Sequence, residues 1–85
     1  MRKRANFSDE HARIVNEILP GLDAMAAYRV GIGSSMALIF GLEPTRNLLE
    51  TCARSESIEE AAEFSRAWAW RELLARKEKQ QGGAR

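Results

Sequence analysis

Apolar residues concentrate in the middle of the chain, and the regions before and after it alternate apolar and charged positions with a helical period. The middle run, residues 22–42, has only two charged side chains, Asp23 and Arg29. Its apolar positions predict a helix, although Gly31 and Gly33 are each about 1 kcal/mol less favourable than alanine inside one. We expect a helix that is either continuous or broken at these glycines. The alternative is a β-hairpin that pairs residues 28–32 with residues 36–40 and turns at residues 33–35.

Small residues recur at every fourth position of this run, in two rows. The rows are Ala27, Gly31 and Ser35, and Gly33, Ala37 and Gly41. Because such rows carry little side chain, the backbone of another helix can approach them closely. We assign the row that begins at Ala27 to self-association. The larger residues that we expect on one side of the helix are Leu22, Met25, Ala26, Ile32, Met36 and Phe40.

A shorter helix is predicted on the N-terminal side of the run. Ser8 is a typical N-cap residue, Asp9 and Glu10 suit the first turn, and Pro20 ends the helix. Its apolar residues are Ile14, Val15, Ile18 and Leu19. His11 falls on the same side, so we expect a partly buried histidine with a backbone or carboxylate partner.

Two helices are predicted on the C-terminal side. Gly41 suits a helix C-terminus, and Pro44 suits the first position of the next helix. The apolar stripe of that helix is Thr45, Leu48, Leu49 and Cys52. Cys52 is expected to be a buried free thiol. Ser57 and Glu60 form a capping box, which begins a last helix that runs to about residue 79.

The last helix has apolar side chains on more of its circumference than one packing neighbour needs. Trp68 and Trp70 are two residues apart, so they point to opposite sides of the helix. Trp68 shares a stripe with Phe64, and we assign both to self-association. Trp70 lies beside Ala67 and Leu74, and we assign these three residues to an intersubunit or partner-binding surface. The alternative is that Trp70 packs within the chain, against the first helix or the N-terminal arm.

Together these patterns predict an all-α protein, a small bundle of three to four helices. With 85 residues, the chain buries only about 60% of the surface that its unfolded form exposes, so we expect homodimerisation to complete its core. The predicted domain covers residues 7–79, between a disordered basic arm at residues 1–6 and a disordered tail at residues 80–85.

Charge and composition limit the cellular compartments in which the chain is expected and the kinds of site that it can form. Both ends are basic, whereas residues 5–70 hold five basic and ten acidic side chains. The N-terminus lacks the apolar stretch of a secretory signal, and the longest uncharged run is too short to span a bilayer. One cysteine and one histidine exclude an internal disulfide and a structural zinc site. We expect a cytoplasmic protein that does not enter a membrane.

Catalysis has little support in the sequence. The acidic side chains are spread over helix surfaces, and no nucleophile has a base at a matching spacing. The segment that contains Gly31 and Gly33 has neither the third glycine of the dinucleotide-binding motif nor the Gly-Lys pair of the P-loop. We therefore expect no enzyme activity, no cofactor and no metal.

Residues 36–54 also fit a helix-turn-helix in part, which would contact nucleic acid through Thr45, Arg46 and Asn47. Asn47 stands where an apolar residue should fix the recognition helix, and the acidic body of the chain opposes phosphate binding. We therefore predict a small non-enzymatic regulator, inhibitor or assembly factor that binds another protein through a helical apolar surface. A helix-turn-helix-like DNA-binding regulator is the alternative.

Overall fold

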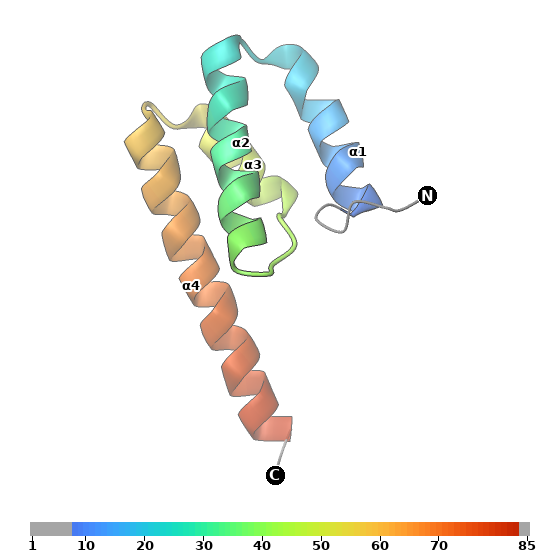
Figure 1. Cartoon of the computed structure of the whole chain (residues 1–85), viewed down its shortest axis with the longest axis vertical. Coiled ribbons are helices and arrows are strands. Elements are labelled where there is room, and N and C mark those ends of the chain that lie inside the picture. The colour runs from blue at the N-terminus through green and yellow to red at the C-terminus, as the bar shows by residue number, and fades with distance from the viewer. Residues whose placement is uncertain (1–7, 84–85) are drawn as a thin grey trace.

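The computed structural model describes residues 8–83, and the chain folds there as four α-helices without a β-strand (Figure 1). They are α1 (Asp9–Ile18), α2 (Ala24–Ile39), α3 (Arg46–Arg54) and α4 (Ile58–Gly83), with a 3-10 turn, η1 (Leu19–Gly21), after α1. This arrangement confirms the prediction of a small all-α bundle. The predicted arm at residues 1–6 lies outside the described residues, as do residues 84–85 of the predicted tail. Helix α4 continues through residues 80–83.

Side-chain caps define where the helices begin. The Ser8 hydroxyl accepts a hydrogen bond from the backbone N–H three residues later at 3.0 Å, and the Ser57 hydroxyl does the same at 3.0 Å. Both predicted N-caps are therefore confirmed. Asp23 caps α2 in the same way at 2.8 Å. These bonds satisfy N–H groups that have no partner within the helix.

Helix α3 begins later than predicted. The Thr45 hydroxyl accepts the backbone N–H of Leu48 at 3.2 Å, so Thr45 is the N-cap and Arg46 is the first helical residue. Pro44 therefore precedes the cap, and the prediction that it occupies the first helical position is wrong. Thr45 is exposed and does not belong to the apolar stripe of α3.

Helix α2 is one unbroken helix of 16 residues. The prediction of a helix is confirmed, and both the break at the glycines and the hairpin are wrong. The helix ends where predicted, because Gly41 adopts a φ of 71° that side chains disfavour. The Gly41 N–H donates to the Leu38 carbonyl at 3.0 Å and the Leu42 N–H to the Ala37 carbonyl at 2.8 Å. This pair of bonds is a Schellman motif, which turns Leu42 back into the core.

Helices α2, α3 and α4 pack against one another, and α1 is attached more loosely (Figure 1). Helix α4 runs alongside α2 in the same direction and then projects beyond the bundle. The buried hydrophobic residues are Ile14, Ala26, Val30, Ala37, Leu42, Leu48, Leu49, Cys52, Ala61, Trp68 and Ala69. The predicted burial of the free Cys52 thiol is confirmed.

Helix α2 approaches α3 and α4 closely because one of its sides carries small residues. A Cβ atom at Gly33 would lie 2.8 Å from Cys52 Sγ and 3.4 Å from Leu49 Cδ2 on α3, and 3.5 Å from Ser65 Oγ on α4. Gly33 thus lies where three helices meet, and this close packing offsets the low helix propensity of glycine. We call the buried residues of α2 its inner face: Ala26, Val30, Gly33, Ser34 and Ala37.

The larger residues expected on one side of α2 do not form its buried side. Among those residues only Ala26 is buried, whereas Met25 is 56% exposed and Phe40 is 40% exposed. The half-buried ones are Leu22, Ile32 and Met36. The cause is steric: the small residues permit closer helix contact, so they are buried in preference to the larger ones.

Candidate protein-interaction surfaces

The side of α2 opposite its inner face is apolar and open to solvent. It contains a hollow of about 440 Å³, and we call the residues that line it the outer face of α2: Ala27, Tyr28, Gly31, Ile32, Ser35, Met36 and Ile39. Tyr28 is 59% exposed and Ile39 is 74% exposed. The three small residues predicted for self-association therefore lie together on an open surface, and their role stays a prediction.

The outer face of α2 carries no charge, because the single charged residue of this helix points elsewhere. The Arg29 guanidinium donates to the Ala53 carbonyl at 3.0 Å and to the Cys52 carbonyl at 3.4 Å. These carbonyls belong to the last turn of α3, where a cation is favourable. Sequence reasoning missed this role of Arg29, since nothing local indicates which helix end an arginine reaches.

A second exposed apolar surface lies on α4. We call five exposed residues on one side of this helix the α4 stripe: Glu63, Ala67, Trp70, Leu74 and Lys77. Trp70 is 63% exposed and Leu74 is 42% exposed. Beside the stripe is a hollow of about 500 Å³, and its lining residues are Phe40, Glu63, Arg66, Ala67, Trp70 and Leu73. The three residues predicted for an intersubunit or partner surface thus share one exposed side of α4, and their function stays a prediction.

The other two residues assigned to self-association lie inside the chain. Trp68 is only 7% exposed and Phe64 is half-buried against the same core. The structure therefore corrects the placement of Trp68, which fills its own core and presents no free surface to a second copy. The spacing argument was sufficient to separate the two tryptophans but not to say which one is buried.

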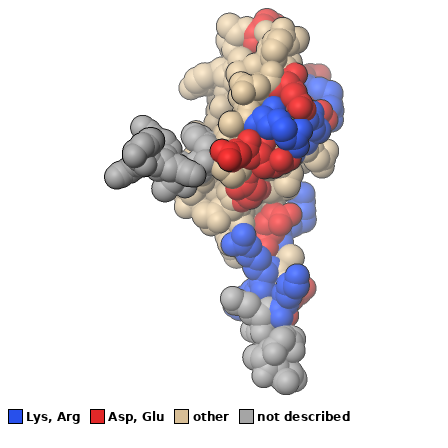
Figure 2. Space-filling model, turned by 90° about the vertical axis from the view of Figure 1, so that its right-hand side faces the viewer, with Lys and Arg blue, Asp and Glu red and all other residues tan. Residues whose placement is uncertain are grey.

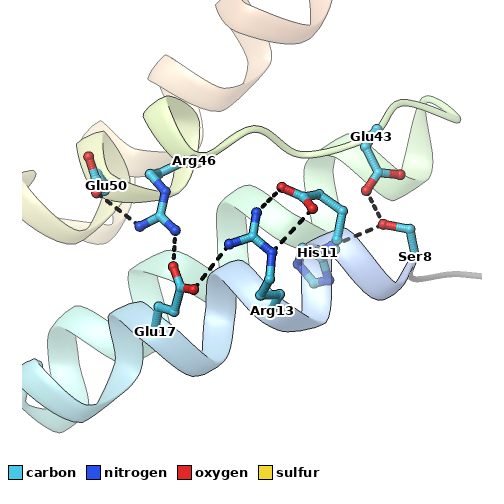
Figure 3. Close-up of polar contacts among 8 residues, drawn as sticks. Ser8, His11, Arg13, Glu17, Glu43, Arg46 and Glu50 are labelled. Atoms are coloured by element: carbon cyan, nitrogen blue, oxygen red, sulfur yellow. Dashed lines mark hydrogen bonds and ion pairs between the residues drawn. The ribbon is translucent and has the colours of Figure 1, made fainter.

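Charged side chains connect α1 with α3 (Figure 3). Arg13 pairs with Glu10 and, at 3.0 Å, with Glu17 on α1. Glu17 also pairs with Arg46 on α3, which lies 3.6 Å from Glu50. The hydrogen bond from Arg46 is the main reason that the pKa of Glu17 is lowered. Because these side chains are about half-exposed, we expect the pairs to orient α1 rather than to stabilise it strongly.

Of the residues assigned to nucleic acid, Arg46 belongs to this network and Asn47 is exposed. Arg46 lies between the carboxylates of Glu17 and Glu50, so a phosphate would have to compete with both. Thr45 uses its hydroxyl as an N-cap. On this side of the molecule, acidic and basic side chains lie intermixed (Figure 2). The geometry does not favour the DNA-binding alternative, which stays a prediction.

His11 is buried between α1 and α2. Its Nε2 atom lies 2.7 Å from Ser34 Oγ, and its exposed fraction is 5%. Burial lowers the pKa of His11, and the negative charge of Glu43 opposes that change. The Ser8 hydroxyl donates a hydrogen bond to Glu43. His11 lies on the buried side of its helix as predicted, but it is fully rather than partly buried, and its contact with the Ser34 hydroxyl, which was not predicted, connects α1 to the inner face of α2.

The Cys52 thiol is enclosed by the core. Its Sγ atom lies 3.2 Å from Ser65 Oγ, and burial raises the pKa of this thiol above its usual value. A thiol in this state is a poor nucleophile at neutral pH. Among residues 8–83, no cluster of His, Cys, Asp and Glu side chains could hold a metal ion. None of the helices in that range combines the length and the apolar character that crossing a membrane requires.

On the outer face of α2, the sequence assigned only the small residues Ala27, Gly31 and Ser35 to contact with another copy, and the exposure of its large residues was not recognised. A signal was present, because Tyr28, Ile32, Ser35 and Ile39 recur at four- and three-residue intervals. Such a period reveals that residues share a side of a helix, but it does not reveal whether that side is covered.

No protein-family model, no curated protein and no solved structure matches this chain. Its function is therefore argued from the geometry and chemistry of its own residues.

Proposed function

We propose that this chain is a small non-enzymatic regulator, inhibitor or assembly factor that binds a helix of another protein on the outer face of α2. One observation carries the proposal. Helix α2 is the most apolar helix of the chain and has apolar residues on opposite sides, yet one of these sides is uncovered. A helix of this kind is normally buried on all sides. A partner helix on the outer face would complete that burial.

The chemistry of the outer face indicates what kind of helix it accepts. Because it has no charged side chain, a charged partner surface would lose hydration there without gaining an ion pair. Gly31 and Ser35 leave room for close approach, and apart from its chain neighbours and the adjoining helix backbone, nothing lies within 4 Å of the position that a Gly31 Cβ would take. Tyr28 and Ile39 are large and exposed, as interface anchors usually are. The expected partner is an amphipathic helix that presents its apolar side.

The proposal can be tested with a charge placed on the outer face. In Ile39→Glu, a carboxylate would be buried in the complex, so we expect the dissociation constant for the partner to rise by at least about tenfold. The matched control is Asn16→Glu, which adds the same charge at an exposed position of α1. Immobilised wild-type and variant chains would first be used to capture partners from a lysate of the source cell. Affinity would then be measured with the purified partner.

Two outcomes would contradict the proposal. One is that Ile39→Glu and Asn16→Glu bind the purified partner as tightly as the wild type. The other is that Ile39→Glu disrupts self-association but leaves the binding of other proteins unchanged. The outer face would then be a contact between copies of this chain. Both positions are exposed, so circular dichroism should show the same helix content in all three chains.

A further inference from the structure

We infer that two copies of this chain associate through their α4 helices, which pair antiparallel with the symmetry axis at Trp70. This inference rests on the α4 stripe and is independent of the outer face of α2. Its observations are the exposure of the stripe, the spacing of its residues and the distribution of charge along α4.

The α4 stripe has the spacing of a helix-pairing seam. Its five residues follow one another at intervals of four, three, four and three, which is the repeat of a coiled coil. The opposite side of α4 is covered, because Ala61, Ser65 and Trp68 are buried against the bundle. The stripe itself is exposed, with Trp70 at its centre. A second helix could therefore lie along α4 without displacing any part of the chain.

Charge divides α4 at Trp70. Residues 58–69 hold three glutamates and one arginine, whereas residues 71–79 hold four basic side chains and two glutamates. Basic side chains are prominent on the projecting end of the molecule (Figure 2). Within the stripe, Glu63 lies seven residues before Trp70 and Lys77 lies seven residues after it. The stripe thus has an apolar centre with opposite charges at its two ends.

This pattern is complementary to itself in one orientation only. In an antiparallel pair with its axis at Trp70, a position seven residues before the axis meets the position seven residues after it. Glu63 of each copy would then lie beside Lys77 of the other copy. A parallel pair in register would place Glu63 against Glu63 and Lys77 against Lys77, which is unfavourable. The charges therefore identify a second, antiparallel copy as the occupant of the α4 stripe.

The apolar residues fit the same arrangement. Position 74 of one copy lies opposite position 66 of the other, which is part of the lining of the hollow beside Phe40. Leu74 of each copy would thereby be placed over the hollow of its neighbour, and the two Trp70 side chains would meet at the axis. Large aromatic side chains of this kind dominate the binding energy of many interfaces.

Charge reversal tests the orientation as well as the interface. We expect the full chain to sediment with twice its mass of 9.5 kDa at micromolar concentration and low salt. Glu63→Lys and Lys77→Glu should each raise the dimer dissociation constant roughly tenfold, because each turns two attractive pairs into repulsive ones. The double variant Glu63→Lys/Lys77→Glu should restore the wild-type value. The differences should shrink at high salt.

Matched controls carry the same charge changes on the other side of the helix. Glu72→Lys and Lys79→Glu lie about half a turn away from the stripe, and both positions are exposed. We expect them to leave the dissociation constant unchanged, and Trp70→Ala to abolish the dimer without loss of helix content. A monomeric wild type would overturn the inference, as would single reversals without effect or a double variant without rescue. Ile39→Glu should leave this dimer intact, so a failure here is distinct from a failure of the proposed function.

Discussion

The two faces of α2 belong to one helical backbone and are both uncharged, but they have different neighbours. The inner face packs on α3 and α4, and at Gly33 there is no room for even one additional carbon atom. The outer face carries Gly31 at an equivalent place on the other side, where nothing lies within 4 Å of an added Cβ. Both faces are apolar, so hydrophobicity does not separate them. Steric fit to a neighbouring helix decides which face is buried.

This difference separates folding from binding within one helix. Residues of the inner face and their neighbours should determine the free energy of unfolding. Residues of the outer face should affect that free energy little and affect partner binding strongly, because their surface is still available. Three comparisons test this contrast, and each sets a residue of the inner face, or a buried neighbour of that face, against a residue of the outer face.

The largest contrast is expected from loss of an aliphatic side chain. Leu49 is fully buried beside Gly33, so Leu49→Ala should lower the free energy of unfolding by about 2–5 kcal/mol. Ile39 is 74% exposed on the outer face, so Ile39→Ala should change it by less than about 0.5 kcal/mol. Urea unfolding followed by circular dichroism measures both values. Equal losses from the two variants would show that the outer face is part of the folding core.

The two glycines provide a smaller and more specific contrast. Gly31→Ala should stabilise the chain by about 0.5–1 kcal/mol, because alanine has the higher helix propensity and fits without a clash. Gly33→Ala receives the same propensity gain, but its Cβ would lie 2.8 Å from Cys52 Sγ. We expect the resulting displacement to outweigh the gain and to destabilise the chain by about 1–2 kcal/mol net.

The same unfolding measurement checks the glycine pair, with the sign of the change as the result. If Gly33→Ala were as stabilising as Gly31→Ala, the close approach of the three helices would not be rigid. A useful addition is the effect of Gly31→Ala on binding, because an added methyl group on the outer face should weaken close contact with a partner helix while the chain itself becomes more stable.

The smallest contrast is in the dependence of stability on pH. Burial lowers the pKa of His11 in the folded chain below the unfolded value of 6.5. The unfolded chain therefore binds more protons, so stability should be complete above about pH 6.5 and should decrease as the pH falls from there towards the folded pKa. His11→Gln should remove this decrease. Ser35→Ala, on the outer face beside the inner Ser34, should leave it unchanged.

Chemical unfolding at several values between about pH 7.5 and 5.5 would measure this dependence, above the range in which most carboxylates titrate. The prediction would be contradicted if the wild type and the His11→Gln variant lost stability to the same extent as the pH falls. In that case groups other than His11 would carry the pH dependence.

Features that depend on a few neighbouring residues were predictable. Ser8 and Ser57 begin helices because a hydroxyl reaches an N–H three residues ahead, and Gly41 ends one because it tolerates a positive φ. The burial of Cys52 followed from the apolar period of its helix. The wrong prediction for the start of α3 also has a local cause. Pro44 and Thr45 both suit a helix start, and the helix begins after Thr45, whose hydroxyl supplies the cap.

The candidate surfaces were predictable only in part. The opposite orientation of Trp68 and Trp70 and the exposure of an apolar side of α4 follow from helical geometry. Which side of α2 is buried does not, since both rows of small residues suited close packing and only one row, that of Gly33 and Ala37, is buried in the chain. Helices pack by how closely their backbones approach, and that distance depends on residues from three separate helices around Gly33.

The amino-acid sequence by itself determines that this chain forms helices, that its middle helix is the most apolar of them, and that the charges of its last helix divide at Trp70. These properties belong to single segments, and their physical causes are short-range. The tertiary structure alone decided that Arg29 caps α3 and leaves the outer face of α2 uncharged, that Trp68 is inside and that Trp70 is outside. Each of these features depends on which helices are neighbours in the fold. Steric fit between segments that are distant in the sequence determines that arrangement.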